Sequence, residues 1–171
     1  MILGIGIDLC RISRIRRSLN RFGKAWLDEI SDDAEQQGFT ANTDLALTAA
    51  IAVAVKEAGA KTLGVGMTDG VRWRDIVVTR SIDGIGVQLQ GGAAQQAQAL
   101  ASGTGYSIRA DAMVTPTWVV ASAALISGKT TSMNLRAITT ALASSLQTLP
   151  AISPIQITAD RPQSGPSRAP L

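Results

Sequence analysis

The sequence predicts an α+β fold with a mainly antiparallel sheet packed against one long helix. Three observations lead to this prediction. A Gly-rich apolar segment at the N-terminus has the pattern of a buried strand, and an Ala-rich stretch over residues 43–63 has the pattern of a long helix. Later β-like segments are joined by short turns, which favours antiparallel pairing over a doubly wound parallel sheet.

The first third of the chain is expected to hold one strand followed by short helices. Residues 2–8 alternate Gly with branched aliphatic residues, which suits a buried strand that ends at Asp8 and has close backbone neighbours. Apolar residues then recur at helical spacing over residues 12–30. A new helix start is expected at residues 31–33, and a loop at residues 38–42.

The long helix over residues 43–63 is the most clearly predicted element. Asn42 or Thr43 is expected to cap its start. Gly59 weakens the helix by about 1 kcal/mol relative to Ala, and such a glycine often has a packing reason. The helix is expected to end at the flexible turn formed by residues 64–66, which contains Gly64 and Gly66.

The remainder is expected to run strand, strand, helix, strand, strand, helix. The first two strands are close enough to form a hairpin with a turn at residues 81–84. These elements are predicted at residues 74–79, 86–90, 93–101, 106–109, 117–124 and 133–149. The predicted organisation is one domain over residues 1–125, an extra C-terminal helix over 126–149, and a Pro/Ser-rich flexible tail over 150–171.

Composition excludes several kinds of chemistry. The 171-residue chain contains no histidine, which excludes a serine–histidine relay and histidine-ligated zinc. Cys10 is the only cysteine, so no intrachain disulfide forms, and its apolar setting indicates a core residue. No segment approaches the roughly 18 consecutive apolar residues of a membrane span. The N-terminal apolar stretch precedes the basic one, unlike a secretory signal, and a cytoplasmic location is expected.

Asp8 and Glu57 are the leading candidates for a metal site. Two carboxylates from separate elements can hold a hard divalent cation such as Mg²⁺, and Lys56 and Lys61 lie where they could bind the phosphates that such a cation bridges. The alternative is an ordinary exposed helix pair of Glu57 with Lys61, four residues apart. Asp8 argues against it, because a charge at the end of an apolar strand needs a partner.

A basic stripe is the second candidate for a functional surface. It contains six of the sixteen basic residues and no acid. The stripe is either a solvated helix face or a docking surface for an acidic partner, whose association would weaken with salt. Nucleic acid is not expected, because the stripe lacks interleaved aromatic residues. Its members are Arg11, Arg14, Arg16, Arg17, Arg21 and Lys24.

At these residues the sequence resembles the holo-acyl-carrier-protein synthases of the 4′-phosphopantetheinyl transferase superfamily. The matching segments occur in the family's order over about the first 125 residues. Each one is modest, and the ordered set is fairly specific. They are GIGIDL at residues 4–9, RISRI at 11–15, RFGKAWLDEI at 21–30, KEAGAKTLGVG at 56–66 and GVRWRDIVV at 70–78.

The resemblance implies an α+β subunit that assembles as a homotrimer with active sites between subunits. It implies transfer of the 4′-phosphopantetheine arm of coenzyme A to a serine of an acyl carrier protein. Asp8 and Glu57 would hold Mg²⁺ and Lys61 would neutralise charge on the phosphoryl group. Lys56, Gly64 and Gly66 would contact the coenzyme. Arg14, Arg21 and Phe22 would meet the acidic helix of the carrier.

The sequence also departs from the family at positions expected to line the coenzyme pocket. Ala52 and Val53 stand where the family commonly has an arginine and an aromatic residue, and Ala110 stands in place of a histidine. Arg11 replaces a usual glutamate. The alternative function is therefore a catalytically weak or inactive carrier-binding subunit that retains the synthase fold. A third alternative is an α+β oligomer of unrelated function.

Overall fold

The computed structural model describes residues 1–40, 44–81, 84–128 and 134–148. It has the predicted α+β architecture, with helices and antiparallel strands in the expected order. The elements are β1 (Ile2–Arg11), α1 (Ile12–Phe22), α2 (Lys24–Ile30), α3 (Asp33–Thr40), α4 (Leu45–Lys61), the 3₁₀ turn η1 (Trp73–Asp75), β2 (Ile76–Ser81), β3 (Gly84–Leu89), α5 (Gly91–Leu100), β4 (Tyr106–Val114), β5 (Trp118–Ser127) and α6 (Leu135–Thr148).

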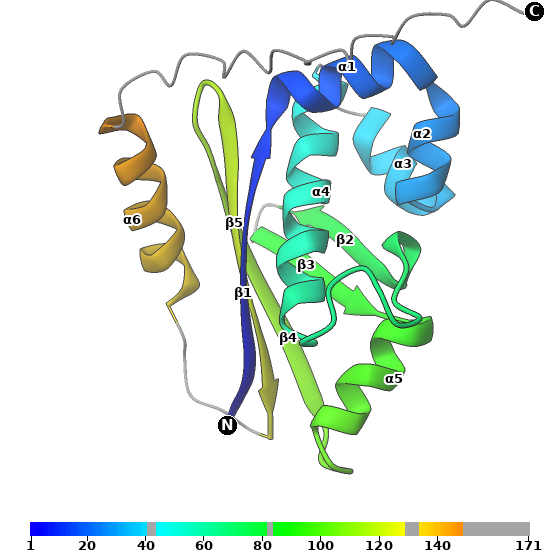
Figure 1. Ribbon diagram of the computed structural model, residues 1–171, viewed down its shortest axis with the longest axis vertical. Coiled ribbons are helices and arrows are strands. Elements are labelled where there is room, and N and C mark those ends of the chain that lie inside the picture. Colours follow the sequence, from blue (N-terminus) through cyan, green and yellow to red (C-terminus); the bar gives the residue numbers. More distant parts are fainter. Residues whose placement is uncertain (41–43, 82–83, 129–133, 149–171) are drawn as a thin grey trace, which may run out of the picture.

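Two antiparallel sheets surround helix α4. Strands β1, β5 and β4 form a three-stranded sheet in that order, and β2 pairs with β3 as the predicted hairpin. Figure 1 shows α4 running along one face of the larger sheet, with the β2–β3 hairpin on the other side of the helix. Helix α4 packs against β1, β5, β4 and β2, which explains why the helix is rich in small buried residues.

Glycines in β1 allow the strand to lie directly against α4. A Cβ atom on Gly4 would come within 2.0 Å of the Thr62 carbonyl oxygen, and one on Gly6 within 1.9 Å of the Ala58 carbonyl oxygen. Contacts this short are impossible for any residue with a side chain. The Gly alternation of the N-terminal segment is therefore what brings Asp8, two residues further along β1, close to the side chains of α4.

Helix α6 covers the opposite face of the larger sheet, as Figure 1 shows. Its Leu135 packs with Ala124 and Ile126 of β5. The Thr139 hydroxyl lies 2.8 Å from the buried Ser122 hydroxyl of the same strand. The predicted C-terminal helix is thus present, although β5 extends to Ser127, past the predicted domain boundary at residue 125. The predicted flexible tail lies outside the described residues.

Three predicted boundaries differ from the structure. Strand β1 does not end at Asp8 but continues to Arg11, because pairing with β5 extends to Trp118. Residues 38–40 belong to α3 and are not a loop. The cap of α4 is Asp44, whose carboxylate accepts a hydrogen bond of 3.0 Å from the Leu47 amide. The predicted caps, residues 42 and 43, lie outside the described residues.

One other expectation is met. Cys10 is a core residue, with 4% of its surface exposed. Within the described ranges, every helix is too short or too polar to cross a bilayer.

Candidate functional site

Asp8 and Lys61 meet where β1 crosses α4. The Lys61 ammonium donates a hydrogen bond of 2.8 Å to the Asp8 carboxylate and another of 2.8 Å to the Ile7 carbonyl oxygen. The Asp8 side chain is 18% exposed and that of Lys61 is 44% exposed. This ion pair is therefore accessible to solvent and to a ligand.

Glu57 lies one helical turn before Lys61 and completes the group. Partial burial raises the pKa of the Glu57 carboxyl, and the negative charge of Asp8 raises it further, while Lys61 and Arg14 act in the opposite direction. Asp8 and Glu57 both line the same cavity. Two neighbouring carboxylates with incomplete compensation form a site that favours an additional cation.

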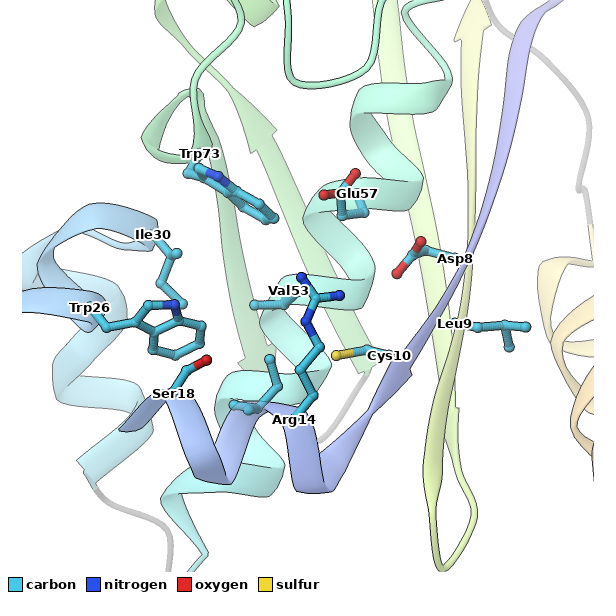
Figure 2. Close-up of a pocket in the computed structure, with 11 residues that line it drawn as sticks. Asp8, Leu9, Cys10, Arg14, Ser18, Trp26, Ile30, Val53, Glu57 and Trp73 are labelled. Carbon is cyan, nitrogen blue, oxygen red and sulfur yellow. The ribbon is translucent and has the colours of Figure 1, made fainter. Parts of the chain in front are cut away.

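These carboxylates open onto a cavity of about 180 Å³. One end of the cavity is charged, with Asp8, Glu57 and Arg14, and the other is apolar. Figure 2 shows the indoles of Trp26 and Trp73 on the apolar side, across the cavity from Asp8. The complete lining consists of Asp8, Leu9, Cys10, Arg14, Ile15, Ser18, Trp26, Ile30, Val53, Glu57 and Trp73. The cavity can therefore accept a ligand with one charged and one apolar end.

Helix α1 carries the predicted carrier-binding residues. Arg14 is exposed and lines the cavity, and Figure 2 shows its guanidinium close to Val53 and pointing toward the Glu57 side. Arg21 and Phe22 lie at the C-terminal end of the helix, where the Arg21 guanidinium stacks 4.9 Å from the Phe22 ring centroid. Seven residues separate Arg14 from Arg21, which is close to two helical turns and places both on one face.

Lys56 does not belong to this site, contrary to the sequence prediction. Its side chain is fully buried and forms an ion pair of 2.9 Å with the equally buried Glu35 carboxylate. Adjacent helical residues point in directions about 100° apart, so Lys56 faces the interior when Glu57 faces the cavity. A lysine in this position cannot contact a coenzyme bound at the cavity mouth.

The predicted turn residues Gly64 and Gly66 follow directly after α4. Both have positive φ angles, 79° and 63°, and a Cβ on either would meet no atom within 4 Å. Backbone conformation therefore requires glycine here, whereas packing does not. The Gly64 amide donates a hydrogen bond of 3.2 Å to the Lys61 carbonyl oxygen, so the turn is tied to the end of the helix.

The positions that depart from the family have different surroundings. Val53 lines the cavity, so an aromatic residue there would reduce its volume. Ala52 is 1% exposed in the core, and Ala110 packs against the same core cluster. Of these three, only Val53 directly shapes the cavity.

Three residues around the site are not among the candidates that the sequence indicates. Trp26 and Trp73 were part of matching segments but were not expected to line a cavity. Glu35 was not singled out at all. A signal for it exists: the Glu35 amide donates a hydrogen bond of 2.8 Å to the Asp32 carboxylate, and the Glu35 carboxylate accepts from the Asp32 amide at 3.4 Å. This is the reciprocal capping pattern of an Asp-x-x-Glu segment.

The two carboxylates fit a Mg²⁺ ion that substrate and water also coordinate better than a metal ion coordinated by protein side chains alone. The described part of the chain contains no group of three or more acidic, cysteine or histidine side chains that could hold a metal. Mg²⁺ commonly binds through one or two carboxylates, completed by substrate phosphates and water. Asp8 and Glu57 supply such a pair at one cavity.

Comparisons with known proteins identify the family of this chain. Residues 4–111 match the family profile described as the 4′-phosphopantetheinyl transferase superfamily. The holo-[acyl-carrier-protein] synthase of Methylobacterium nodulans is 44% identical over 101 residues, which cover 58% of this chain and 76% of that protein. The synthase of Roseobacter denitrificans is 41% identical over 106 residues, covering 62% and 79%.

Solved structures share the fold. The crystal structure of the holo-[acyl-carrier-protein] synthase from Neisseria meningitidis superposes with a TM-score of 0.64 at 25% identity, covering 74% of this chain and 99% of that one. The Bacillus anthracis synthase in complex with CoA (3′,5′-ADP) superposes with a TM-score of 0.61 at 24% identity, covering 75% and 99%. The family profile, the relatives and the fold lead to one conclusion: the chain belongs to the holo-[acyl-carrier-protein] synthase family of the 4′-phosphopantetheinyl transferase superfamily.

Proposed function

We propose that this protein transfers the 4′-phosphopantetheine arm of coenzyme A to a serine of an acyl carrier protein and requires Mg²⁺ to do so. One observation carries the proposal: Asp8, Glu57 and Lys61 come together at the mouth of a cavity in a chain of this family. The relatives named above are synthases of holo-[acyl-carrier-protein], which supports the same substrates here.

The reaction is a phosphoryl transfer. The serine hydroxyl gives up its proton to water and its oxygen forms a bond to the phosphorus that carries the pantetheine. The P–O bond of the pyrophosphate breaks, and 3′,5′-ADP leaves with the electron pair. Asp8 and Glu57 would hold the Mg²⁺, which supplies charge stabilisation to the pyrophosphate when bound. Lys61 would place its positive charge beside the same oxygens. Its hydrogen bonds to Asp8 and Ile7 hold the ammonium in position.

The carrier protein would dock along α1. Arg14 at the cavity and Arg21 with Phe22 at the helix end place positive charge and one exposed aromatic ring on the same face. Phe22 is 53% exposed, which leaves its ring available to an apolar contact. Attraction of an acidic helix by these arginines would fall with ionic strength, because exposed charges are screened by salt.

The test is incubation of the full chain with coenzyme A, Mg²⁺ and an apo carrier, followed by mass spectrometry of the carrier. We expect a mass gain of one phosphopantetheine arm that EDTA abolishes. Asp8→Asn is expected to lose transfer, whereas Asp33→Asn, which changes an exposed aspartate of α3, should retain it. Absence of a gain with several carriers, beside an active control synthase, would reject the proposal.

A second experiment distinguishes the enzyme from the alternative, a carrier-binding subunit without catalysis. Val53 in place of an aromatic residue, with Ala52 and Ala110, favours that alternative. Asp8, Glu57 and Lys61 favour the enzyme. Calorimetric titration of coenzyme A with and without Mg²⁺ distinguishes them. An enzyme should bind the coenzyme in a Mg²⁺-dependent manner, and a docking subunit should bind only the carrier.

We further propose that the protein assembles as a homotrimer. Ile5, Ile7 and Leu9 project from β1 with 49%, 39% and 45% of their surface exposed, which is unusual for three apolar residues on one strand. Burial of this row between subunits would remove it from water. Light scattering on the purified chain is expected to give the trimer mass, and a monomer mass at every concentration would contradict this.

A further inference from the structure

The buried ion pair between Lys56 and Glu35 lies directly behind the candidate site. Both side chains are 0% exposed, and removing two charges from water is costly unless every polar atom gains a partner. Here the polar atoms of both side chains have hydrogen-bond partners. The Lys56 ammonium donates to the Glu35 carboxylate, to the Trp73 carbonyl oxygen at 3.0 Å, and to the Ile76 carbonyl oxygen. These three bonds use all three donors of a lysine.

Glu35 completes the network from the other side. One of its carboxylate oxygens accepts the Lys56 bond, and the other accepts a hydrogen bond of 2.8 Å from the Val78 amide. The pair therefore joins α3 through Glu35 and α4 through Lys56 to two consecutive elements, η1 through Trp73 and β2 through Ile76 and Val78.

The link to Trp73 gives this network a role in the site. The backbone carbonyl of Trp73 accepts from Lys56, while its indole lines the cavity opposite Asp8 and near Glu57 (Figure 2). The same tryptophan also borders a second, more open hollow of about 610 Å³ that includes Arg72 and Arg74. A shift of η1 would thus move the wall between two hollows.

An apolar pair of similar size could fill the space of Lys56 and Glu35 and would avoid the cost of burying two charges. Such a pair could not hold the Trp73 and Ile76 carbonyls or the Val78 amide. The charged pair therefore adds directional hydrogen bonds, which connect helix α4 to the backbone on the opposite side of the cavity.

We propose that Lys56 and Glu35 are positioning residues, which fix η1 and with it the Trp73 indole relative to Glu57. This inference rests on the proposed function for its kinetic consequence. Its structural consequence is independent of the proposed function, since the position of Trp73 can be measured without turnover.

The experiment uses the full chain labelled with 5-fluorotryptophan. The chain has three tryptophans and therefore gives three ¹⁹F resonances. Single Trp→Phe variants assign them. The test variant is Lys56→Met with Glu35→Leu, which leaves no unpaired buried charge. We expect it to fold with a lower melting temperature than the wild type, because the Ile76 carbonyl and the Val78 amide lose their buried side-chain partners. The Trp73 resonance should shift or broaden while that of Trp118, on β5, stays in place.

Kinetics supply the second readout. The double variant is expected to lose about 10–100-fold in kcat/KM for coenzyme A, the range typical of residues that orient a site from behind it. Glu35→Gln, which keeps an acceptor for the Val78 amide, should lose less. The control is Arg136→Met, which breaks an exposed ion pair to Asp111 on the far side of the sheet and should leave resonances and rates unchanged.

Each outcome decides the proposal. A folded double variant with an unmoved Trp73 resonance and wild-type kcat/KM would overturn it. Failure of the double variant to fold would also overturn it, because the pair would then serve stability and not position. A shifted Trp73 resonance in a protein whose wild type transfers nothing would support the positioning of η1 while rejecting the proposed function.

Discussion

Lys61 donates a 2.8 Å hydrogen bond to Asp8, one of the two carboxylates proposed to hold Mg²⁺. The Lys61 ammonium therefore contacts a carboxylate that a bound cation would also contact. The pair is partly exposed and can rearrange when a ligand arrives. Lys61 thus compensates the negative charge of Asp8. The consequences of this relationship can be measured on binding and on turnover separately.

Lys61→Met is expected to bind Mg²⁺ several-fold more tightly than the wild type in the absence of coenzyme A. Removal of the ammonium leaves Asp8 and Glu57 with less compensation, which increases their attraction for a cation. Transfer should nevertheless fall by about 100-fold, because in the proposed reaction the same ammonium would stabilise the phosphoryl group. Calorimetry and the carrier assay measure the two effects. Lys61→Arg, which keeps the charge, is the control, and equal Mg²⁺ affinity in Lys61→Met and wild type would contradict the expectation.

Glu57→Gln is expected to raise the free energy of unfolding at neutral pH. The pKa of Glu57 is higher in the folded protein than in the unfolded chain, so its ionised form destabilises the fold. This penalty is absent below the unfolded pKa and is complete once the pH exceeds the folded pKa. The advantage of the Gln variant should therefore be largest at neutral pH and disappear on acidification. Urea unfolding across this pH range measures it.

Glu29→Gln is the matched control for that series, because Glu29 is an exposed carboxylate on α2. Its unfolding free energy should follow that of the wild type at every pH. A Glu57→Gln variant less stable than wild type at neutral pH would mean that the Glu57 charge is compensated in the folded state.

Cys10 is expected to resist thiol reagents in the folded protein. Burial, together with the negative charge of Asp8, raises the pKa of its thiol to about 11, and only 4% of the residue is exposed. At about pH 8, roughly one thiol in a thousand would be ionised even if a reagent could reach it. Reaction with Ellman's reagent should become fast only in denaturant. Rapid labelling of the native protein would show that the cavity wall opens at Cys10.

Gly6→Ala is expected to destabilise the protein by about 3 kcal/mol, because its methyl group would overlap the Ala58 carbonyl and force β1 away from α4. Asp8 would move with the strand, so Mg²⁺ affinity should fall as well. Gly38→Ala is the matched control. Gly38 lies in α3, where an added methyl group would meet no atom within 4 Å, and this change should stabilise the helix by about 0.5–1 kcal/mol. Thermal unfolding of both variants tests the contrast.

Much of the fold follows from local patterns that a reader can find in the sequence. The alternation at residues 2–8, the Ala-rich run that forms α4 and the short turn of the β2–β3 hairpin each have a period or composition set by neighbouring residues. Element ends were predicted less well. Strand β1 passes Asp8 because β5 provides partners up to Arg11, and no local signal reports the length of a distant strand.

The candidate site divides in the same way. Glu57 and Lys61 share a helix face because they are four residues apart, so their proximity is a local property that the sequence determines by itself. Asp8 could be proposed as their partner from its place in an apolar strand, and the glycines before it indicated a close neighbour. The tertiary structure decided the role of Lys56. Both Lys56 and Glu57 are charged and adjacent, and only the packing of α3 and η1 against α4 determines which one is buried against Glu35 and which faces the cavity.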